Sequence, residues 1–212
     1  MQDLSKMRQE YDAESLNEAD MASDPIKEFM EWMDEAIAAK LSEPNAMVIA
    51  TSTSDGKPSA RVVLLKEVND CGFVFFTNYL SRKGMELLSN PFAAVVFDWH
   101  DMGRQVRIEG RVEKLSAEES DNYFNTRPEN AKTGAWSSPQ SKIIKSRDEL
   151  DELQKETERM FAGNTIYRPS HWGGFLIRPE VIEFWKGRQS RMHDRIAYYK
   201  TEDGWSINRL AP

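Results

Sequence analysis

The chain has 212 residues, of which 40% are hydrophobic and 30% charged, so we expect one domain with a substantial core. Its formal net charge of −7 argues against nonspecific binding to nucleic acid or to anionic membranes. Cys71 is the only cysteine, which excludes an internal disulfide and fits a reducing compartment. No apolar run reaches membrane-spanning length, and residues 1–24 lack the apolar stretch of a signal peptide. We therefore expect a cytoplasmic protein.

The sequence also argues against two common kinds of site. His100, His171 and His193 lie far apart and have no cysteine partners, so we expect no metal site. The glycines do not form a GxGxxG or GxxxxGK[ST] pattern, which disfavours nucleotide binding through a Rossmann or P-loop unit.

The N-terminal part of the chain is predicted to be a mobile arm over residues 1–23, followed by a single domain over residues 24–212, because the first segment is polar. Asp24 can cap a helix whose first position is Pro25. Apolar residues follow at helical spacing, which predicts an amphipathic helix over residues 25–42.

The remainder of the chain is predicted to be mostly strands. Ser54-Asp55-Gly56-Lys57 and Glu202-Asp203-Gly204 are hairpin signals. Strands are expected at residues 46–53, 59–66, 73–78, 92–99, 105–115, 173–177, 181–186, 193–200 and 205–208. Helices are expected at residues 81–88, 116–127 and 146–161, the last two opened by capping boxes. Strands joined by tight turns, with helices as excursions, predict a mainly β (α+β) fold: an antiparallel barrel with flanking helices.

The segment Arg191-Met192-His193-Asp194-Arg195 indicates an anion-binding site. In an extended strand, side chains two residues apart share a face, which would place Arg191, His193 and Arg195 side by side. Such a group favours a small anionic ligand between its members, since like charges repel. A solvated strand face explains this segment alone equally well.

Further patterns would suit anionic ligands. Arg61 and Lys66 bracket an apolar strand and would point to opposite faces, so they can serve two different anionic groups. The segment from Thr77 to Lys83 ends a strand and opens a helix, and it carries hydroxyls and two adjacent cations, as a phosphate cradle does. Surface cations and an ordinary helix cap explain these patterns equally well.

Two more pairs would suit a ligand with a ring. Tyr123 and Arg127 lie four apart on one helix face, and Gln105 and Arg107 share a strand face. A helix-surface pair is the plainer interpretation of the first pair, and a polar outer sheet face explains the second equally well. Taken with Trp99, Trp136, Trp172 and Trp185, the phosphate-type sites are what binding of two phosphorylated ring compounds would require.

The order of these motifs along the chain closely resembles the pyridoxamine 5′-phosphate oxidase family. The resemblance runs from Arg8-Gln9-Glu10-Tyr11 to the last residue. It is carried by Arg61-Val-Val-Leu-Leu-Lys66, Phe76-Thr77-Asn78, Ser81-Arg82-Lys83, Arg104-Gln105-Val106, Tyr123-Phe124-Asn125-Thr126-Arg127-Pro128, Gly134-Ala135-Trp136, Gln140-Ser141, Trp172-Gly173-Gly174-Phe175, Glu183-Phe184-Trp185, Arg191-Met192-His193-Asp194-Arg195 and Arg209-Leu210-Ala211-Pro212.

The resemblance implies an FMN-binding split barrel that works as a homodimer with FMN at the subunit interface. The implied reaction oxidises pyridoxine 5′-phosphate or pyridoxamine 5′-phosphate to pyridoxal 5′-phosphate, by hydride transfer from substrate C4′ to flavin N5. Oxygen reoxidises the flavin to give hydrogen peroxide, and pyridoxamine phosphate also releases ammonia.

The resemblance also assigns residues to each ligand. The implied FMN contacts are Arg61, Val62, Val63, Leu64, Leu65, Lys66, Phe76, Thr77, Arg82, Lys83, Gln105, Gln140, Ser141, Trp185 and Arg195. The implied substrate contacts are Arg8, Tyr11, Lys66, Tyr123, Arg127, Arg191 and His193.

The resemblance also implies a role for each of these groups. Lys66, Tyr123 and Arg127 would anchor the substrate phosphate, and Arg191 and His193 are the expected catalytic pair. We expect Arg191 to orient the substrate and His193 to assist binding or proton movement. Arg195 is expected to stabilise negative charge on the reduced flavin.

One position departs from the family pattern. The family commonly has a serine four residues after the phosphate-binding arginine, and this chain has Ala131 there. The lost hydrogen bond is worth about 1.5–3 kcal/mol when charge-assisted, which predicts weaker substrate binding with the chemistry preserved. Thr133, Asn130 or a water molecule would have to substitute for the missing hydroxyl.

Two other functions are compatible with parts of the pattern. A flavin reductase of the same barrel would keep the FMN residues but would need neither Tyr123 with Arg127 nor Arg191 with His193. A noncatalytic protein that stores or delivers FMN or pyridoxal phosphate would use the same binding residues, and only turnover distinguishes it from the oxidase.

Overall fold

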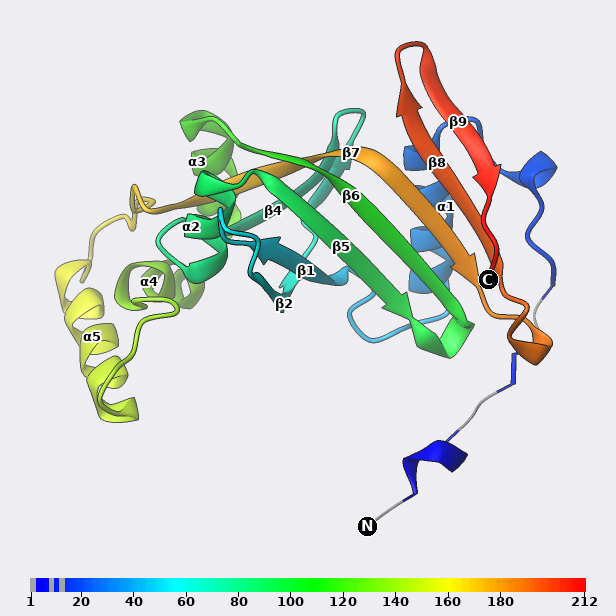
Figure 1. Cartoon of the computed structure of the whole chain (residues 1–212). Coiled ribbons are helices and arrows are strands. Elements are labelled where there is room, and N and C mark those ends of the chain that lie inside the picture. Colours follow the sequence, from blue (N-terminus) through cyan, green and yellow to red (C-terminus); the bar gives the residue numbers. More distant parts are fainter. Residues whose placement is uncertain (1–2, 8–9, 12–13) are drawn as a thin grey trace.

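The computed structural model describes residues 3–7, 10–11 and 14–212. Its described strands form one antiparallel sheet that curves into a half-barrel (Figure 1). The strands are β1 (Ala46–Ser52), β2 (Pro58–Leu64), β3 (Glu67–Asn69), β4 (Gly72–Asn78), β5 (Phe92–Trp99), β6 (Arg104–Lys114), β7 (Trp172–Lys186), β8 (Asp194–Thr201) and β9 (Gly204–Arg209). The α-helices are α1 (Pro25–Ala38), α2 (Arg82–Ser89), α3 (Ala117–Thr126), α4 (Glu129–Ser137) and α5 (Arg147–Met160). Short 3₁₀ turns are η1 (Leu4–Lys6), η2 (Glu18–Asp20), η3 (His100–Met102) and η4 (Gln189–Arg191).

Strand β7 connects the two ends of the molecule. The sheet order is β2-β1-β5-β6-β7-β4-β3, and β8 and β9 continue from the other half of β7. Asn78 of β4 pairs with Trp172 at the start of β7, whereas Arg195 of β8 pairs with Trp185 near its end. In Figure 1, helices α2 to α5 gather at the first end, and the β8–β9 hairpin and η4 lie at the other. The expected barrel-like antiparallel sheet with flanking helices is confirmed.

Helix α1 covers the half-barrel. Asp24 accepts a hydrogen bond from the Ile26 N–H at 3.0 Å, so the predicted cap is present. The ring of Phe29 lies 4.9 Å from those of Phe73 and Phe97, which makes this helix part of the main core. The helix ends at Ala38 rather than at residue 42, because Lys40 has a φ of 58° in the left-handed region.

The predicted strands 173–177 and 181–186 are one continuous strand, β7. Pro179 lies in the gap between the two predicted strands, and its missing N–H is tolerated because β4 has ended and β8 has not begun at this point. The pairing with β6 changes register there, between Glu109 and Gly110. Gly110 is required by the close approach, because a Cβ would lie 2.0 Å from the Arg178 carbonyl oxygen.

Helix α4 was not predicted from the sequence. Its residues, Glu129–Ser137, are mostly polar, and Pro128 before them looks like a terminator, although proline is well suited to the start of a helix. The predicted helices over residues 81–88, 116–127 and 146–161 are present as α2, α3 and α5, with each end shifted by one residue.

The N-terminal segment contributes to the main core from Leu16 onward. Leu16 and Met21 are buried in the main core, and the Tyr198 hydroxyl donates to the Ala22 carbonyl at 2.7 Å. The division at residue 23/24 therefore does not separate two independent parts in this structure. Mobility of the arm over residues 1–23 stays a prediction.

Candidate functional site

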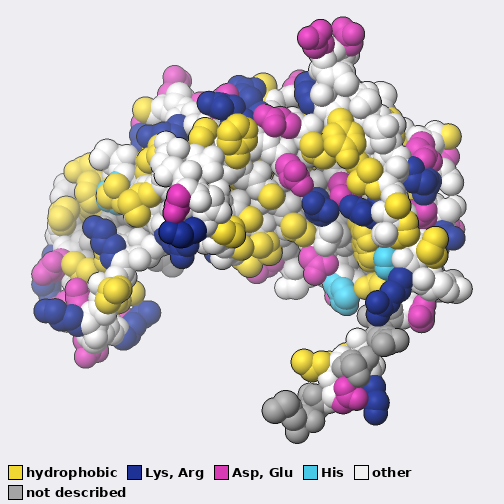
Figure 2. Space-filling model, in the orientation of Figure 1, with side chains coloured by type: hydrophobic (Ala, Val, Ile, Leu, Met, Phe, Trp, Pro, Cys, Tyr) yellow, Lys and Arg dark blue, Asp and Glu magenta, His cyan; other side chains and the backbone are white. Residues whose placement is uncertain are grey.

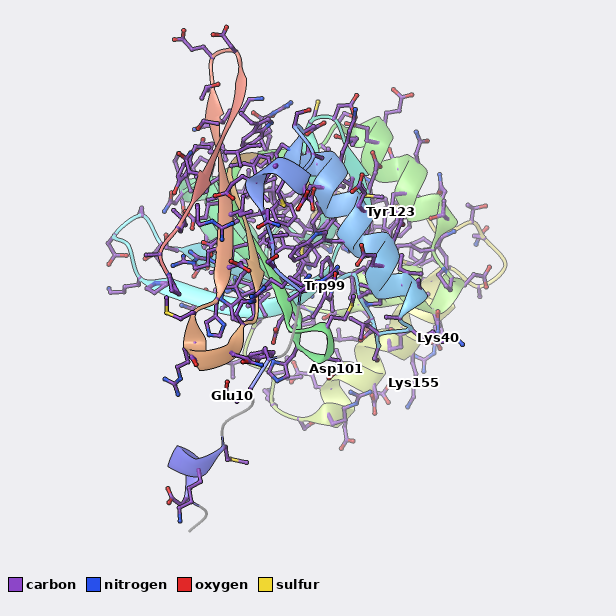
Figure 3. All side chains as sticks on the ribbon, turned by 90° about the vertical axis from the view of Figure 1, so that its right-hand side faces the viewer. Glu10, Lys40, Trp99, Asp101, Tyr123 and Lys155 are labelled. Atoms are coloured by element: carbon purple, nitrogen blue, oxygen red, sulfur yellow. The ribbon has the colours of Figure 1, made fainter. Side chains whose placement is uncertain are left out.

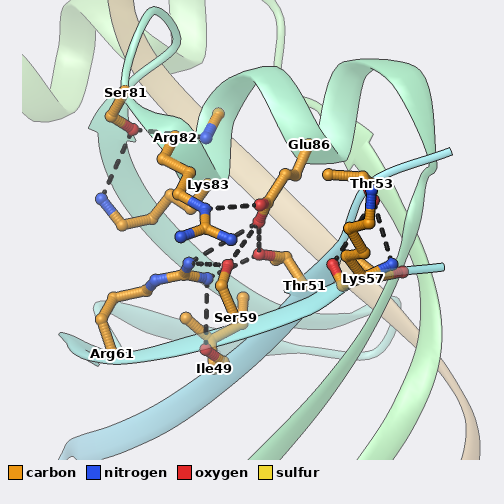
Figure 4. Close-up of polar contacts among 12 residues, drawn as sticks. Ile49, Thr51, Thr53, Lys57, Ser59, Arg61, Ser81, Arg82, Lys83 and Glu86 are labelled. Carbon is orange, nitrogen blue, oxygen red and sulfur yellow. Dashed lines mark hydrogen bonds and ion pairs between the residues drawn. The ribbon is translucent and has the colours of Figure 1, made fainter. Parts of the chain in front are cut away.

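A cluster of cations lies where β4 passes into α2 (Figure 4). The Ser81 side chain caps α2 by accepting from the Gly84 N–H at 3.3 Å, so the capped helix start is present as predicted. Lys83, in the first turn, is buried, and its Nζ donates to Thr77 Oγ1 at 3.0 Å and to Gln140 Oε1 at 3.1 Å. Burial and the neighbouring Arg61 lower the pKa of Lys83 to about 8. A buried cation among neutral oxygens is suited to an anionic ligand.

Glu86 holds the arginines of this cluster in place. Its buried carboxylate pairs with Arg82 Nε at 2.8 Å and Arg61 Nη2 at 3.6 Å, and it accepts from the Thr51 and Ser59 hydroxyls. Burial alone would raise the pKa of Glu86, but hydrogen bonds from Thr51, Ser59 and Arg82 outweigh it and lower the pKa to about 2. The carboxylate is therefore ionised at neutral pH, and the cluster keeps an excess of positive charge.

A second site adjoins the first through Phe76, the residue before Thr77. The rings of Phe76, Tyr123 and Trp172 stack, with 3.8 Å between the centroids of Phe76 and Tyr123. The Arg127 guanidinium lies over Trp172 at 4.5 Å, and its Nη1 is buried without a hydrogen-bond partner. Burial lowers the pKa of Arg127 and raises that of Tyr123. A buried, unpaired guanidinium N–H indicates an anionic ligand that completes its hydrogen bonds.

The missing hydroxyl at Ala131 is not replaced by Thr133. The Thr133 hydroxyl donates to the Asn130 carbonyl at 3.0 Å and accepts from Gln154 Nε2 at 2.8 Å. Its single O–H donor is thus already used by the Asn130 carbonyl, and the expectation of a weaker phosphate contact stays a prediction.

A third group lies at the far end of β7. Gln105 pairs with Trp185 across β6 and β7, and the His193 ring is 4.7 Å from that of Trp185. Tyr11 completes the group, with its ring 5.7 Å from Trp185 and 6.0 Å from His193. Arg195 Nε donates to Glu183 Oε1 at 2.7 Å, which raises the pKa of the guanidinium.

The strand-face argument for Arg191, His193 and Arg195 is wrong. Strand β8 begins at Asp194, and Arg191 belongs to the turn η4 with a φ of 60°, so side-chain alternation does not apply to it. His193 precedes the strand, and its Nδ1 accepts from the Arg188 N–H at 3.0 Å. Neutral His193 then carries its proton on Nε2, the nitrogen left to act as a donor.

The alternation argument for Arg61 and Lys66 also changes, because β2 ends at Leu64. The Arg61 side chain joins the cation cluster, whereas exposed Lys66 lies beyond the strand, tied to β4 by its N–H to the Val74 carbonyl at 2.8 Å. The two cations do lie in different surroundings. The reason is that the strand ends between them, and not that side chains alternate along it. Between them, Val62 is exposed, Val63 and Leu64 are half-buried, and Leu65 is buried.

The remaining predicted contacts fall on described residues with one exception. Ser141 follows Gln140 at the edge of the cation cluster, is exposed and has a φ of 70°. Arg8 lies outside the described residues.

Sequence reasoning missed the two buried acids of these sites. Arg82 and Glu86 are four residues apart on one helix, a spacing that signals an ion pair and could have identified Glu86. Glu183 binds Arg195 and Arg107 from neighbouring strands, and no local spacing marks that relation.

Within one chain, the predicted site residues fall into two widely separated halves. The cation cluster and Arg127 lie at the Trp172 end of β7, and Tyr11, Gln105, His193 and Arg195 lie at the Trp185 end. Thirteen residue steps at about 3.3 Å each separate those tryptophans by roughly 40 Å of strand. A small ligand held by Arg127, which lies over Trp172, therefore does not reach His193, which lies against Trp185, within a single chain.

Comparison with known proteins accounts for this arrangement. Residues 33–155 match the family described as pyridoxamine 5′-phosphate oxidase, and residues 172–212 match the pyridoxine 5′-phosphate oxidase C-terminal dimerisation region. The chain belongs to the pyridoxamine 5′-phosphate oxidase family. The second match spans β7, β8 and β9 and contains His193 and Arg195 of the far half of the site.

Relatives of known name match the whole chain. The pyridoxine/pyridoxamine 5′-phosphate oxidase of Trichormus variabilis is 53% identical over 99% of this chain and 98% of its own length. That of Cupriavidus necator is 52% identical over the full length of both proteins. Among solved structures, PhzG from Burkholderia lata, in complex with tetrahydrophenazine-1-carboxylic acid, is 31% identical over 92% of this chain and 95% of that chain, with a TM-score of 0.86. A pyridoxamine 5′-phosphate oxidase-related, FMN-binding protein from Nostoc punctiforme shares the fold, at 16% identity over 91% of this chain and all of its own and a TM-score of 0.71.

Residues 3–7, 10–11 and 14–212 contain no helix long and apolar enough to cross a membrane. The same residues contain no group of three or more His, Cys, Asp or Glu that is arranged to hold a metal ion.

Proposed function

We propose that this protein is an FMN-dependent oxidase that makes pyridoxal 5′-phosphate. Pyridoxine 5′-phosphate and O2 give pyridoxal 5′-phosphate and hydrogen peroxide, and pyridoxamine 5′-phosphate with O2 and water also releases ammonia. The observation that carries the proposal is the presence of two anion sites at the same end of β4, the Lys83 cluster at Thr77 and the Arg127 site beside the aromatic stack of Phe76. FMN and the substrate each carry one phosphate, so the two anion sites match the two ligands.

The residues of the cation cluster fit the phosphate of FMN. Arg61, Arg82 and Lys83 supply the positive charge, and Thr77 and Gln140 supply neutral hydrogen-bonding groups beside Lys83. When bound, FMN accepts two electrons and a proton equivalent from the substrate and passes the electrons to oxygen.

The substrate is held by its phosphate and its ring. Arg127 Nη1, left without a partner, is placed to donate to the phosphate, with Tyr123 and Lys66 as further contacts. From the far half of the site, Arg191 orients the substrate, and His193 donates from Nε2 rather than serving as an essential base. Arg8 and Tyr11 complete the substrate contacts.

The active protein is a homodimer in which FMN lies between the subunits. The two halves of the site lie at opposite ends of one chain, so each complete site takes one half from each subunit. Exposed apolar side chains on β1 and β2, Val48 and Val62 among them, give this face the character of an interface. Figure 2 shows apolar side chains along the lower middle of the molecule, where Figure 1 places β1 and β2. A cytoplasmic location is supported by the single, exposed Cys71.

The test is anaerobic addition of pyridoxine 5′-phosphate to the FMN-loaded protein while flavin absorbance is followed. We expect the absorbance to fall and to recover when air is admitted. No change with either phosphorylated vitamer, together with bleaching by NADH or NADPH, would identify a flavin reductase instead. Bleaching by neither donor would favour a protein that stores or delivers its ligand.

A further inference from the structure

Gly187, directly after β7, lies against the ring of Tyr11. Its φ is outside the left-handed region, so the backbone conformation does not require glycine here. A Cβ at this position would lie 2.4 Å from Tyr11 Cγ and 2.7 and 2.8 Å from Cδ1 and Cδ2. Rotation of the ring about its own axis leaves Cγ in place, so any larger residue at 187 must displace the Tyr11 side chain.

Gly103 forms the other part of the same surface. A Cβ on Gly103 would lie 2.9 Å from Tyr11 Cδ1, and the Gly187 N–H donates to the Gly103 carbonyl at 2.8 Å. The rings of Trp185, His193 and His100 approach Tyr11 edge-on at 5.7, 6.0 and 6.3 Å. The two glycines thus form a surface without side chains on which the Tyr11 ring packs, and aromatic side chains border that surface.

Glu10, the residue before Tyr11, binds the turn that carries Arg191. Its Oε2 accepts a hydrogen bond from the Ser190 N–H at 3.2 Å. Ser190 and Arg191 have φ values of 55° and 60°, which are unfavourable for residues with a Cβ. Figure 3 shows Glu10 beside the turn between β7 and β8. A carboxylate that fixes one N–H of such a turn favours its unusual conformation over more relaxed ones.

We propose that Gly103 and Gly187 form a seat for Tyr11, and that Glu10, held next to the seated ring, positions the Ser190–Arg191 turn for substrate binding. Gly187 is then a positioning residue that touches neither substrate nor cofactor. The inference rests on the proposed function only for the role of Arg191 toward the substrate. The seat itself is a structural claim that can be tested without turnover.

The structural test uses Gly187→Ala with Gly134→Ala as its matched control. Gly134 also lies outside the left-handed region, and a Cβ there meets nothing within 4 Å. Hydrogen exchange of the peptide spanning residues 187–193 would be measured by mass spectrometry on the FMN-loaded dimer. We expect faster exchange at Ser190 in Gly187→Ala and in Glu10→Ala, and wild-type exchange in Gly134→Ala. Unchanged exchange in both Gly187→Ala and Glu10→Ala would overturn the proposal.

A double-mutant cycle separates the seat from general damage near Gly187. If the added methyl group acts only by displacing the Tyr11 ring, Gly187→Ala has no further effect on exchange or kinetics once Tyr11 is alanine. Additive effects of Tyr11→Ala and Gly187→Ala would contradict the seat.

The kinetic arm measures kcat and KM for pyridoxine 5′-phosphate in the same proteins. We expect Gly187→Ala to raise KM roughly fivefold with kcat within a factor of two, since the turn is displaced but the bound substrate still reacts. If the wild-type protein shows no turnover, the proposed function is refuted, and the hydrogen-exchange result alone then tests the seat. An active wild type with equal KM values for Gly187→Ala and Gly134→Ala would refute the positioning role instead.

Discussion

The guanidinium of Arg195 and the carboxylate of Glu183 face each other between β8 and β7. Arg195 Nε lies 2.7 Å from Glu183 Oε1, and Arg195 Nη2 lies 3.0 Å from Glu183 Oε2. The pair is bidentate and Glu183 is buried, so the carboxylate fixes both the position and the plane of a proposed flavin contact. The Arg195 Nη1 also donates to the Ala211 carbonyl at 2.9 Å, which ties the C-terminal residues to the same site.

Glu183→Gln is expected to weaken FMN binding roughly tenfold with little change in the substrate KM, because the amide cannot hold Arg195 through two charge-assisted bonds. Fluorescence titration of the apoprotein with FMN measures the loss. Glu109→Gln is the control, since Glu109 is exposed and pairs with Arg107 rather than with Arg195. Equal affinities of the two variants would show that Glu183 does not position Arg195.

Glu86→Gln is expected to destabilise the fold by about 3 kcal/mol at neutral pH, since Arg61 and Arg82 would lose a buried carboxylate. The pKa of Glu86 is about 2 against an ordinary 4.5, so its contribution is full above pH 4.5 and disappears as the pH falls toward 2. Urea unfolding from pH 7 to pH 3 measures this. Wild-type stability should approach that of Glu86→Gln at the acid end, and exposed Glu156→Gln should follow the wild type throughout.

FMN binding is expected to weaken as the pH rises above about 8. Lys83 in the free protein has a pKa of about 8, and only its charged form pairs with a phosphate. Above that pH the protein must take up a proton to bind FMN, so the logarithm of the association constant should fall with a slope approaching −1. Riboflavin, which lacks the phosphate, and the variant Lys83→Met should show no such fall. A slope unchanged by Lys83→Met would assign the effect to another group.

Ala131→Ser is expected to lower the KM for pyridoxine 5′-phosphate roughly tenfold with kcat unchanged, because an added hydroxyl near Arg127 supplies a charge-assisted hydrogen bond to the phosphate. Steady-state kinetics with Ala162→Ser, at an exposed position, as the control would measure it. An unchanged KM would mean that another donor already serves the phosphate.

Mixed dimers test whether the two halves of the site come from different subunits. Arg127→Ala and Arg191→Ala should each be nearly inactive alone. After unfolding and refolding an equimolar mixture, half of the dimers contain one of each chain, and one of their two sites is intact, so about a quarter of the wild-type activity should return. No recovery would place both halves of each site in one chain.

The sequence alone predicted those helix starts and turns that depend on residues close together in the chain. The Asp24–Pro25 cap, the hairpin at residues 54–57 and the capped starts of α2 and α3 depend on neighbouring residues, and all are present. Helix α4 and the continuity of β7 were missed because Pro128 and Pro179 are ambiguous locally. Their effect depends on which hydrogen bonds the surrounding strands and helices require.

The same division applies to the site. By itself, the sequence determined the family, and with it the cofactor and substrate class, because many ordered motifs carry that information independently of geometry. The tertiary structure decided which of those residues meet: it gave Arg61 and Arg82 a shared buried carboxylate and put Arg191 in a left-handed turn instead of a strand. It also placed Trp172 and Trp185 at opposite ends of β7. Pairing between distant strands and helices sets these contacts. The spacing of residues along the chain does not predict which distant residues a strand register brings together.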